Sequence, residues 1–356
     1  MVITPVSNPF AALLAAAVRA PSGDNTQPWR FVVDYAAGTI ALQVDETRDR
    51  SPMNSGQRMA RIALGAALEN LLRTANSNGW TVALQSPTPP ALAFLRLQRP
   101  AGQPDHIDKV VTERVTNRRL YDGRPLPAEV LARLVRETPP LDGVRTHWIT
   151  ERERLTALAA LIGRADALMF GEPSMRRAFL SKVRFDAPTT AEVEHGLSLA
   201  SLEATWSERL ALRTLRYLPN WLVRFGGLMK AMAAKARRLI ESASGLCLVV
   251  APDSAEATDL AVGQAVQRAW LALTVEGLAV QPMMSWLVLE NVQEKGDPGL
   301  IASLGRDKLI SVSTDIRTQL GNDIQGRPAF LLRFGYAPPP TGRCGRLPFN
   351  AAHCKP

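Results

Sequence analysis

APSGDNTQPWRF, residues 20–31, joins an alanine-rich run that predicts a helix to a run that predicts a strand. Pro21 and Gly23 end the helix and leave the backbone free to turn. Short polar side chains follow on this turn at positions 22, 24, 25 and 27. Trp29 and Phe31 are two residues apart, so they share one face of an extended chain. The pattern predicts a polar loop that either binds a flat ligand rich in hydrogen-bond acceptors or is a structural turn over a core tryptophan.

The string PSGDNTQPWRF resembles the PSxxNxQPW loop of the nitroreductase family of FMN-dependent oxidoreductases. In particular it is similar to the long, single-chain, two-lobed branch of that family, the Acg-like proteins. In the family this loop packs along the flavin ring at a subunit interface. The resemblance therefore implies that the loop binds FMN through Pro21, Ser22, Gly23, Asn25 and Gln27.

Composition limits the class of protein. The chain has 356 residues, of which 46% are hydrophobic, so it is long enough for a substantial core. Its net charge of +9 favours an anionic partner. Cys247, Cys344 and Cys354 lack a C-x-x-C spacing, which speaks against a disulfide framework and a zinc site. Nucleotide-loop and nucleic-acid motifs are also missing from the sequence, so we expect no nucleic-acid partner.

The apolar run 10–18 has no basic segment before it and leads into the polar loop, so it does not predict a signal peptide. No run has the length needed to cross a bilayer. Together with the scattered cysteines, these features favour a cytoplasmic protein.

Periodicity and turn residues predict the secondary structure. The expected helices are 9–20, 63–78, 107–119, 127–137 and 155–170, and the expected strands are 31–34, 39–44, 80–84, 91–98, 144–150 and 330–337. Gly79 is a natural C-terminal cap for the second of these helices, and residues 99–105 are expected to be a linker.

One helical pattern occurs twice. ALGAALENLLRTANSNG, residues 63–79, and AVGQAVQRAWLALTVEG, residues 261–277, carry glycines with the same spacing of 14 (79 − 65 and 277 − 263). Their apolar positions fall in the same register, and a strand-like run follows each. The repeat predicts two copies of one unit fused into a single chain; the alternative is that two amphipathic helices look alike by chance.

With the resemblance, the repeat gives a predicted fold. The fold class is α+β, with two nitroreductase-like lobes packed as a single-chain pseudo-dimer around long central helices. Residues 1–105 form the first lobe, residues 106–170 and 243–356 form the second lobe, and residues 171–242 are a basic helical insertion. The pseudo-dimer is expected to be a monomer or a weak homo-oligomer.

The run Arg114–Val115–Thr116–Asn117–Arg118 resembles the family's R-x-S-x-[RK] phosphate segment. Two arginines and a hydroxyl at alternate positions suit a phosphate; a solvated basic turn is the alternative. The resemblance implies that Arg114, Thr116 and Arg118 bind the flavin phosphate. Arg343 and Arg346 follow a proline run in the place where the family keeps further basic residues for this phosphate.

A further segment, GLAVQPMMS at residues 277–285, resembles the family's segment along the flavin ring, here ending in Pro282, Met283, Met284 and Ser285. Many members carry a Glu–Gly pair where this chain has Met284–Ser285. The backbone N–H of Ser285 would still reach flavin N5, because a backbone donor survives any side-chain change except proline. The missing glutamate removes the family's usual substrate or nicotinamide contact. Core packing is the alternative for both methionines.

The resemblance implies one FMN site per chain, because the first half has the loop and the second half has the arginines. The expected activity is hydride transfer from NADPH or NADH through flavin N5 to a small acceptor such as a quinone or nitro compound, with no side-chain acid or base. The alternative is a flavin storage or sequestration protein whose insertion buries the ring.

Residues 206–240 of the insertion carry eight basic side chains against Glu208 alone, a local charge of +7 (8 − 1). Tryptophans and leucines are interleaved with them. A lid over the flavin is the favoured interpretation. The alternatives are contact with an anionic membrane surface, as for a basic amphipathic helix, and a structural pair of surface helices.

Overall fold

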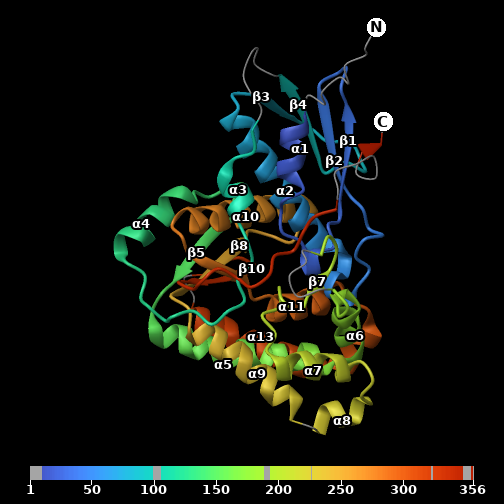
Figure 1. The fold of residues 1–356 in the computed structure, drawn as a ribbon, viewed down its shortest axis with the longest axis vertical. Coiled ribbons are helices and arrows are strands. Elements are labelled where there is room, and N and C mark those ends of the chain that lie inside the picture. Colours follow the sequence, from blue (N-terminus) through green and yellow to red (C-terminus); the bar gives the residue numbers. More distant parts are fainter. Residues whose placement is uncertain are drawn as a thin grey trace.

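The computed structural model describes residues 10–98, 106–187, 193–225, 227–321, 324–347 and 354–355. It is a mixed helix and sheet structure with two main, mostly antiparallel sheets, two long central helices and a helical end (Figure 1). The expected linker at 99–105 lies outside the described residues. No described helix is both long and apolar enough to cross a membrane.

The first sheet is built from the N-terminal quarter of the chain. Its strands are β1 (Trp29–Asp34), β2 (Thr39–Val44), β3 (Thr81–Gln85) and β4 (Ala93–Gln98), in the order β1-β2-β4-β3 and all antiparallel. The two-residue strand β11 (Cys354–Lys355) runs parallel to β1 at the edge. The helix α1 (Ala11–Ala17) and the buried Trp29 and Phe31 contribute to the core beneath this sheet. The predicted 31–34 and 39–44 hairpin is confirmed.

The second sheet has the same strand order. Its strands are β5 (Arg145–Ile149), β8 (Gly245–Ala251), β9 (Ala279–Pro282) and β10 (Arg327–Gly335), in the order β5-β8-β10-β9 and all antiparallel. If the four strands of each sheet are numbered along the chain, their order across the sheet is 1-2-4-3 in both cases. The helix α4 (Ala128–Glu137) precedes β5, as α1 precedes β1.

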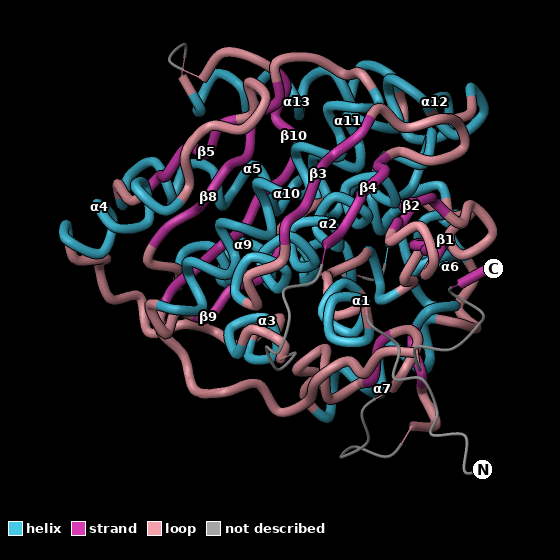
Figure 2. The backbone as a smooth tube through the Cα atoms, turned by 90° about the horizontal axis from the view of Figure 1, so that it is seen from above, coloured by secondary structure: helices cyan, strands magenta, loops and turns pink. Residues whose placement is uncertain are grey.

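A long helix connects the second and third strands of each sheet: α2 (Arg58–Ser77) in the first and α10 (Glu256–Val275) in the second. Figure 2 shows the two lying side by side in the middle of the molecule. A Cβ added to Gly65 would lie 2.0 Å from the carbonyl oxygen of Leu260, and one added to Gly263 would lie 2.0 Å from that of Ile62. The contacts are reciprocal, since each glycine faces the residue three positions before the other.

The two central helices also end alike. Gly79 and Gly277 adopt φ angles of 69° and 70°, the left-handed conformation of a C-terminal cap. The following N–H groups, those of Trp80 and Leu278, each donate over 2.9 Å to the carbonyl five residues earlier. The predicted capping role of Gly79 is confirmed, and the matched glycines of the sequence have matched structural roles.

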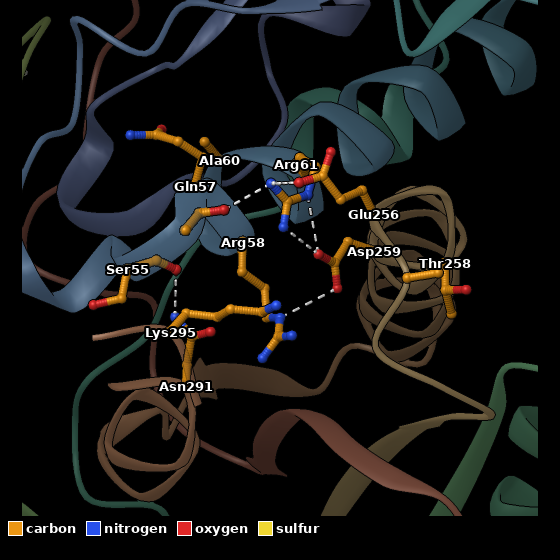
Figure 3. A network of polar contacts seen from close by, with 12 residues as sticks. Ser55, Gln57, Arg58, Ala60, Arg61, Glu256, Thr258, Asp259, Asn291 and Lys295 are labelled. Atoms are coloured by element: carbon orange, nitrogen blue, oxygen red, sulfur yellow. Dashed lines mark hydrogen bonds and ion pairs between the residues drawn. The ribbon is translucent and has the colours of Figure 1, made fainter. Parts of the chain in front are cut away.

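A buried polar network joins the N-terminal ends of α2 and α10 (Figure 3). Arg61 donates to the fully buried carboxylate of Asp259 over 2.9 Å, and the Arg58 guanidinium lies 3.6 Å from the same carboxylate. Arg327, on β10, donates to its other oxygen over 2.9 Å. These bonds connect α2 and β10 to α10.

Helices form the end of the molecule opposite the termini (Figure 1). Between β5 and β8 the chain forms α5 (Arg152–Gly171), α6 (Pro173–Lys182), α7 (Trp206–Leu215), α8 (Asn220–Phe225) and α9 (Leu228–Glu241), with the short strands β6 (Val183–Arg184) and β7 (Leu197–Ser198). Between β9 and β10 it forms α11 (Ser285–Lys295), α12 (Pro298–Leu304) and α13 (Arg306–Leu320). Residues of α5, α9, α11 and α13 share one hydrophobic core. Two 3-10 turns, Gly23–Asn25 and Pro52–Gln57, lie near the central helices.

The predicted helix at 107–119 is wrong over most of its length. Asp108 caps a short helix, α3 (Lys109–Glu113), and the backbone is extended again at Arg114, with φ −54° and ψ 125°. Asn117 then donates its backbone N–H to Val280 of β9 over 2.8 Å. The basic run is therefore held as an extended segment by the second sheet, a long-range pairing that its local periodicity does not reveal.

Candidate functional site

A cavity of about 670 Å³ opens between the central helices and the helical end. Its size falls in the range of roughly 300–1,000 Å³ that is usual for small-molecule sites. The walls come from the loop after α1, the first half of α2, the middle of α10, the extended segment with Thr116 and Arg118, the β9–α11 junction, and helices α5, α6, α7 and α9. Segments from both halves of the chain therefore contribute to one hollow.

The structure brings most of the predicted site residues together. Nine of the fourteen line the cavity: Pro21, Ser22, Gly23, Thr116, Arg118, Pro282, Met283, Met284 and Ser285. The five that do not are Asn25, Gln27, Arg114, Arg343 and Arg346. Three segments far apart in the sequence thus converge on one hollow.

Asn25 and Gln27 bind backbone instead of facing the cavity. The Asn25 amide donates to the carbonyls of Glu194, Gly196 and Gly345, each over 3.3 Å. The Gln27 amide donates to the Glu194 carbonyl over 2.7 Å, and its oxygen accepts the N–H of Leu347 over 3.0 Å. Both residues have positive φ, which turns their side chains toward these loops. They join the polar loop to two segments from the second half of the chain.

Ser22 has two roles in the same loop. Its hydroxyl accepts the backbone N–H of Gln27 over 2.9 Å, which closes the turn, while the residue also lines the cavity. Gly23 lies beside it with space around it, since an added Cβ would meet only Asp49, at 4.0 Å. The loop therefore presents a small, mostly backbone surface to the cavity.

Arg118 is a half-buried cation in the cavity wall. It donates to the carbonyl oxygen of Ser201 over 2.7 Å, and among the described residues no carboxylate lies within ion-pair distance of it. Burial lowers its pKa from the ordinary arginine value, and Asp24 partly offsets this effect. A buried charge is costly unless it is paired, so this position suits an anionic group of a ligand.

Arg114 lies behind the cavity wall. Its guanidinium lies 4.7 Å from the ring centre of Trp270, which lines the cavity, and donates to the Arg19 carbonyl over 2.8 Å. Its buried Nε has no partner in the described part of the chain. Burial lowers its pKa to about 9, and repulsion from Arg346, Arg19 and Arg343 adds to the effect. Positive charge is therefore concentrated next to this wall.

The two C-terminal arginines differ from each other. Arg346 donates to a series of backbone carbonyls, including those of Val18 and Ala20 over 2.8 and 2.9 Å, and to the Asn25 side chain over 3.2 Å. Arg343 is exposed, with a 3.5 Å contact to the Thr112 carbonyl. In this structure Arg346 holds the polar loop against the C-terminal segment.

The β9–α11 junction presents a helix start to the cavity. Met283 belongs to the hydrophobic core and also lines the cavity. The two interpretations of this methionine, core packing and ligand contact, are therefore both compatible with its position. Ser285 is the first residue of α11, so its N–H belongs to the first turn, where helix donors lack intrahelical partners. The positive end of this helix favours negative charge nearby.

Sequence reasoning did not select the acids that line the cavity, among them Asp24 and Asp166. Burial raises the pKa of these two to about 6; the charge of Asp49 raises that of Asp24 further, while the Ser285 hydroxyl lowers that of Asp166. Asp24 belongs to the loop of residues 20–31, so the sequence motif could have identified it as a site residue. Asp166 lies in the middle of α5 with no motif around it, so no sequence signal pointed to it.

The insertion also contributes to the cavity. Ser207, Ala211 and Leu215 of α7 and Lys235 and Leu239 of α9 line its wall. A second cavity, of about 410 Å³, lies beside the first and shares Met59 and Met284 with it. Its rim carries charged side chains of both signs: Arg58, Glu290, Glu294, Arg317 and Arg327.

Comparison with known proteins gives distant likenesses. No protein-family model matches the chain. The uncharacterized protein MT1398 of Mycobacterium tuberculosis (strain CDC 1551 / Oshkosh) is 27% identical over 345 residues, a match that covers 92% of this chain and 45% of that protein. The chain thus spans less than half the length of this curated relative. A crystal structure of the FMN-dependent nitroreductase NfnB from Mycobacterium smegmatis in complex with NADPH is 18% identical, with 64% of this chain and 86% of that chain covered and a TM-score of 0.33.

Proposed function

We propose that this protein is an FMN-dependent NAD(P)H oxidoreductase with a nitroreductase-like fold. One observation carries the proposal: residues 21–23, Thr116, Arg118 and residues 282–285, expected to bind flavin from the sequence motifs, line one cavity although they lie far apart in the chain. The cavity accepts one flavin per chain. The reductant is NADPH or NADH, and the acceptor is a small molecule such as a quinone or nitro compound.

The proposed fold is a single-chain pseudo-dimer. The equal strand order of the two sheets, the reciprocal glycine contacts of α2 and α10, and the matched caps at Gly79 and Gly277 support a duplicated unit. Residues 1–105 are then one lobe and residues 106–170 with 243–356 the other, in a chain that is monomeric or weakly self-associating. The cavity lies between the lobes, as a site at a subunit interface does in a dimer.

The chemistry of the cavity wall fits FMN. Ile62, Ala66, Trp270 and Phe330 provide apolar surface for a flat ring. Arg118, with a charge that no described carboxylate pairs, suits the phosphate, and the Thr116 and Ser22 hydroxyls add polar contacts. Arg114 reinforces the positive potential from behind Trp270. When bound, FMN supplies the hydride-transfer chemistry, while the protein supplies binding, orientation and electrostatics.

The residues around the ring have separate tasks in this proposal. The N–H of Ser285 and the positive end of α11 stabilise negative charge at the polar edge of the ring. The helices of residues 171–242, in their proposed role as a lid, exclude water from the ring. No side-chain acid or base is assigned to the reaction.

A second function, flavin storage, is favoured by one observation. Helices α7 and α9 of residues 171–242 form part of the cavity wall. If they close over the ring, a nicotinamide has no access and the protein holds FMN without turning it over.

The experiment is FMN titration of the Arg118→Ala variant, followed by quenching of flavin fluorescence. Loss of hydrogen bonds to a charged group costs about 1.5–3 kcal/mol, so the variant should bind FMN roughly 10- to 150-fold more weakly. Arg124→Ala is the matched control, because Arg124 is exposed and paired with Asp122 at 2.6 Å. Equal affinity of Arg118→Ala and the control would refute the assignment of the phosphate to this cavity.

A further inference from the structure

Helix α7 has two contrasting faces. Glu208, Leu212 and Leu215, at spacings of four and three, line the cavity and are half-buried or buried. Trp206 and Leu210, also four apart, are 79% and 51% exposed. A helical spacing of four keeps side chains on one face, so the inward face lines the cavity and the outward face presents large apolar groups to solvent.

More exposed apolar side chains follow α7 in the chain. Tyr217 is 80% exposed and Trp221, on α8, is 62% exposed. With Leu218 and Leu222 these residues form what we call the α7–α8 patch: Trp206, Leu210, Tyr217, Leu218, Trp221 and Leu222. The patch holds six of the twelve large exposed hydrophobic side chains in the described part of the chain. Figure 1 shows α8 at the end of the molecule farthest from both termini.

The charges around the patch are positive. Arg213 and Arg216 are exposed between its members, and Arg216 stacks 4.8 Å over the Phe185 ring. Glu208 is the one acid between residues 205 and 240 of the sequence, and Lys235 pairs with it at 2.6 Å. Basic side chains therefore outnumber acidic ones in the stretch that carries the exposed tryptophans.

We propose that the α7–α8 patch docks on an anionic membrane surface. Trp and Tyr side chains suit the boundary between water and lipid because each has an apolar body and a polar tip. A helix with an apolar face and basic neighbours lies in this boundary and is attracted to anionic lipids. The exposed leucines favour lipid over nucleic acid, which offers stacking partners for aromatics but few contacts for aliphatic side chains.

Docking would place lipid on one side of α7 and the cavity on the other. A helix with its side chains is about 10–12 Å thick, so the cavity would lie close to the bilayer surface. The proposal rests on the outward face and its charges, and it holds whatever the cavity binds.

The test is sedimentation of the full-length protein with phosphatidylcholine vesicles, with and without phosphatidylserine. We expect binding to the anionic vesicles, weakened by salt, and a blue shift of tryptophan emission. The double variant Trp206→Ser/Trp221→Ser should lose at least tenfold in partitioning, as well as the blue shift. Arg213→Gln/Arg216→Gln should lose about fivefold for each charge. Leu84→Ser/Val275→Ser is the control, since both residues are exposed elsewhere on the molecule.

Thermal unfolding of each variant checks that it is folded. The proposal is overturned if the wild-type protein stays in the supernatant with anionic vesicles. It is also overturned if the tryptophan variant binds as the wild type does, because the charges alone would then explain the binding. Stronger binding to a single-stranded oligonucleotide, lost in the tryptophan variant, would assign the patch to nucleic acid instead.

Discussion

The crossing of α2 and α10 makes a sharp prediction for Gly65→Ala. The added methyl carbon would lie 2.0 Å from the Leu260 carbonyl oxygen, whereas real Cβ atoms essentially never come closer than 3.0 Å to such a neighbour. The obstacle is backbone of a buried helix and has no rotamer to change. The helices must therefore separate by about 1 Å at their tightest point.

The magnitude follows from two opposing effects. Overpacking a core costs about 1–3 kcal/mol, occasionally more, and the rigid obstacle puts this site at the upper end. Alanine gains about 1 kcal/mol over glycine in helix propensity. We therefore expect Gly65→Ala to lower the free energy of unfolding by about 2 kcal/mol, and Gly263→Ala to do the same because the contacts are reciprocal.

The assay is urea unfolding followed by circular dichroism. Gly171→Ala is the control, because its added Cβ would meet a flexible atom, the Met229 sulfur, at 3.4 Å. The double variant Gly65→Ala/Gly263→Ala should lose less than the sum of the two single losses, because the first methyl group already separates the helices. Single variants as stable as the wild type would refute the close crossing and weaken the case for a duplicated unit.

Three further predictions concern buried polar groups. Asp259→Asn should lower the free energy of unfolding by about 3–5 kcal/mol in urea titrations, since it leaves Arg61 and its neighbours uncompensated; an unchanged midpoint would contradict this. Burial raises the pKa of Asp166 to about 6 from 3.8, so the folded state holds the proton more tightly and stability falls as pH rises through this range. Asp166→Asn should therefore stabilise the protein at pH 7.5, by on the order of 3 kcal/mol, but not at pH 4, and equal effects at both pH values would refute the burial argument. Gln27→Ala should cost about 1–3 kcal/mol and speed hydrogen exchange at the Leu347 amide, which loses its acceptor; an unchanged exchange rate would count against this bond.

Local patterns in the sequence predicted much of the fold. The hairpin at residues 29–44 and helices α2, α4, α5 and α10 follow from periodicity and turn residues. The matched glycines at positions 65 and 263 were predicted as a repeat, and their contact across the helix crossing gives the physical reason for that pattern. These features depend on residues close together in the chain or on one repeated spacing.

The parts that sequence reasoning missed depend on partners far along the chain. The segment from Arg114 is extended because Asn117 pairs with Val280. Asn25 has the residue type expected of a ligand contact, yet its amide points to carbonyls 169 to 320 residues away. Asp166 enters the cavity because α5 packs between α9 and α11. Tertiary packing determines these side-chain orientations and this backbone path. A single sequence does not reveal them before its fold is known.

The visible absorption spectrum of the purified protein tests the central claim most directly. It is recorded without oxygen, before and after addition of FMN and then of NADPH or NADH. The account predicts a bound-flavin spectrum that bleaches rapidly with a nicotinamide. A flavin spectrum that bleaches with dithionite but persists with both nicotinamides would contradict the reductase and support storage. A colourless protein that takes up no FMN would contradict the flavin site itself.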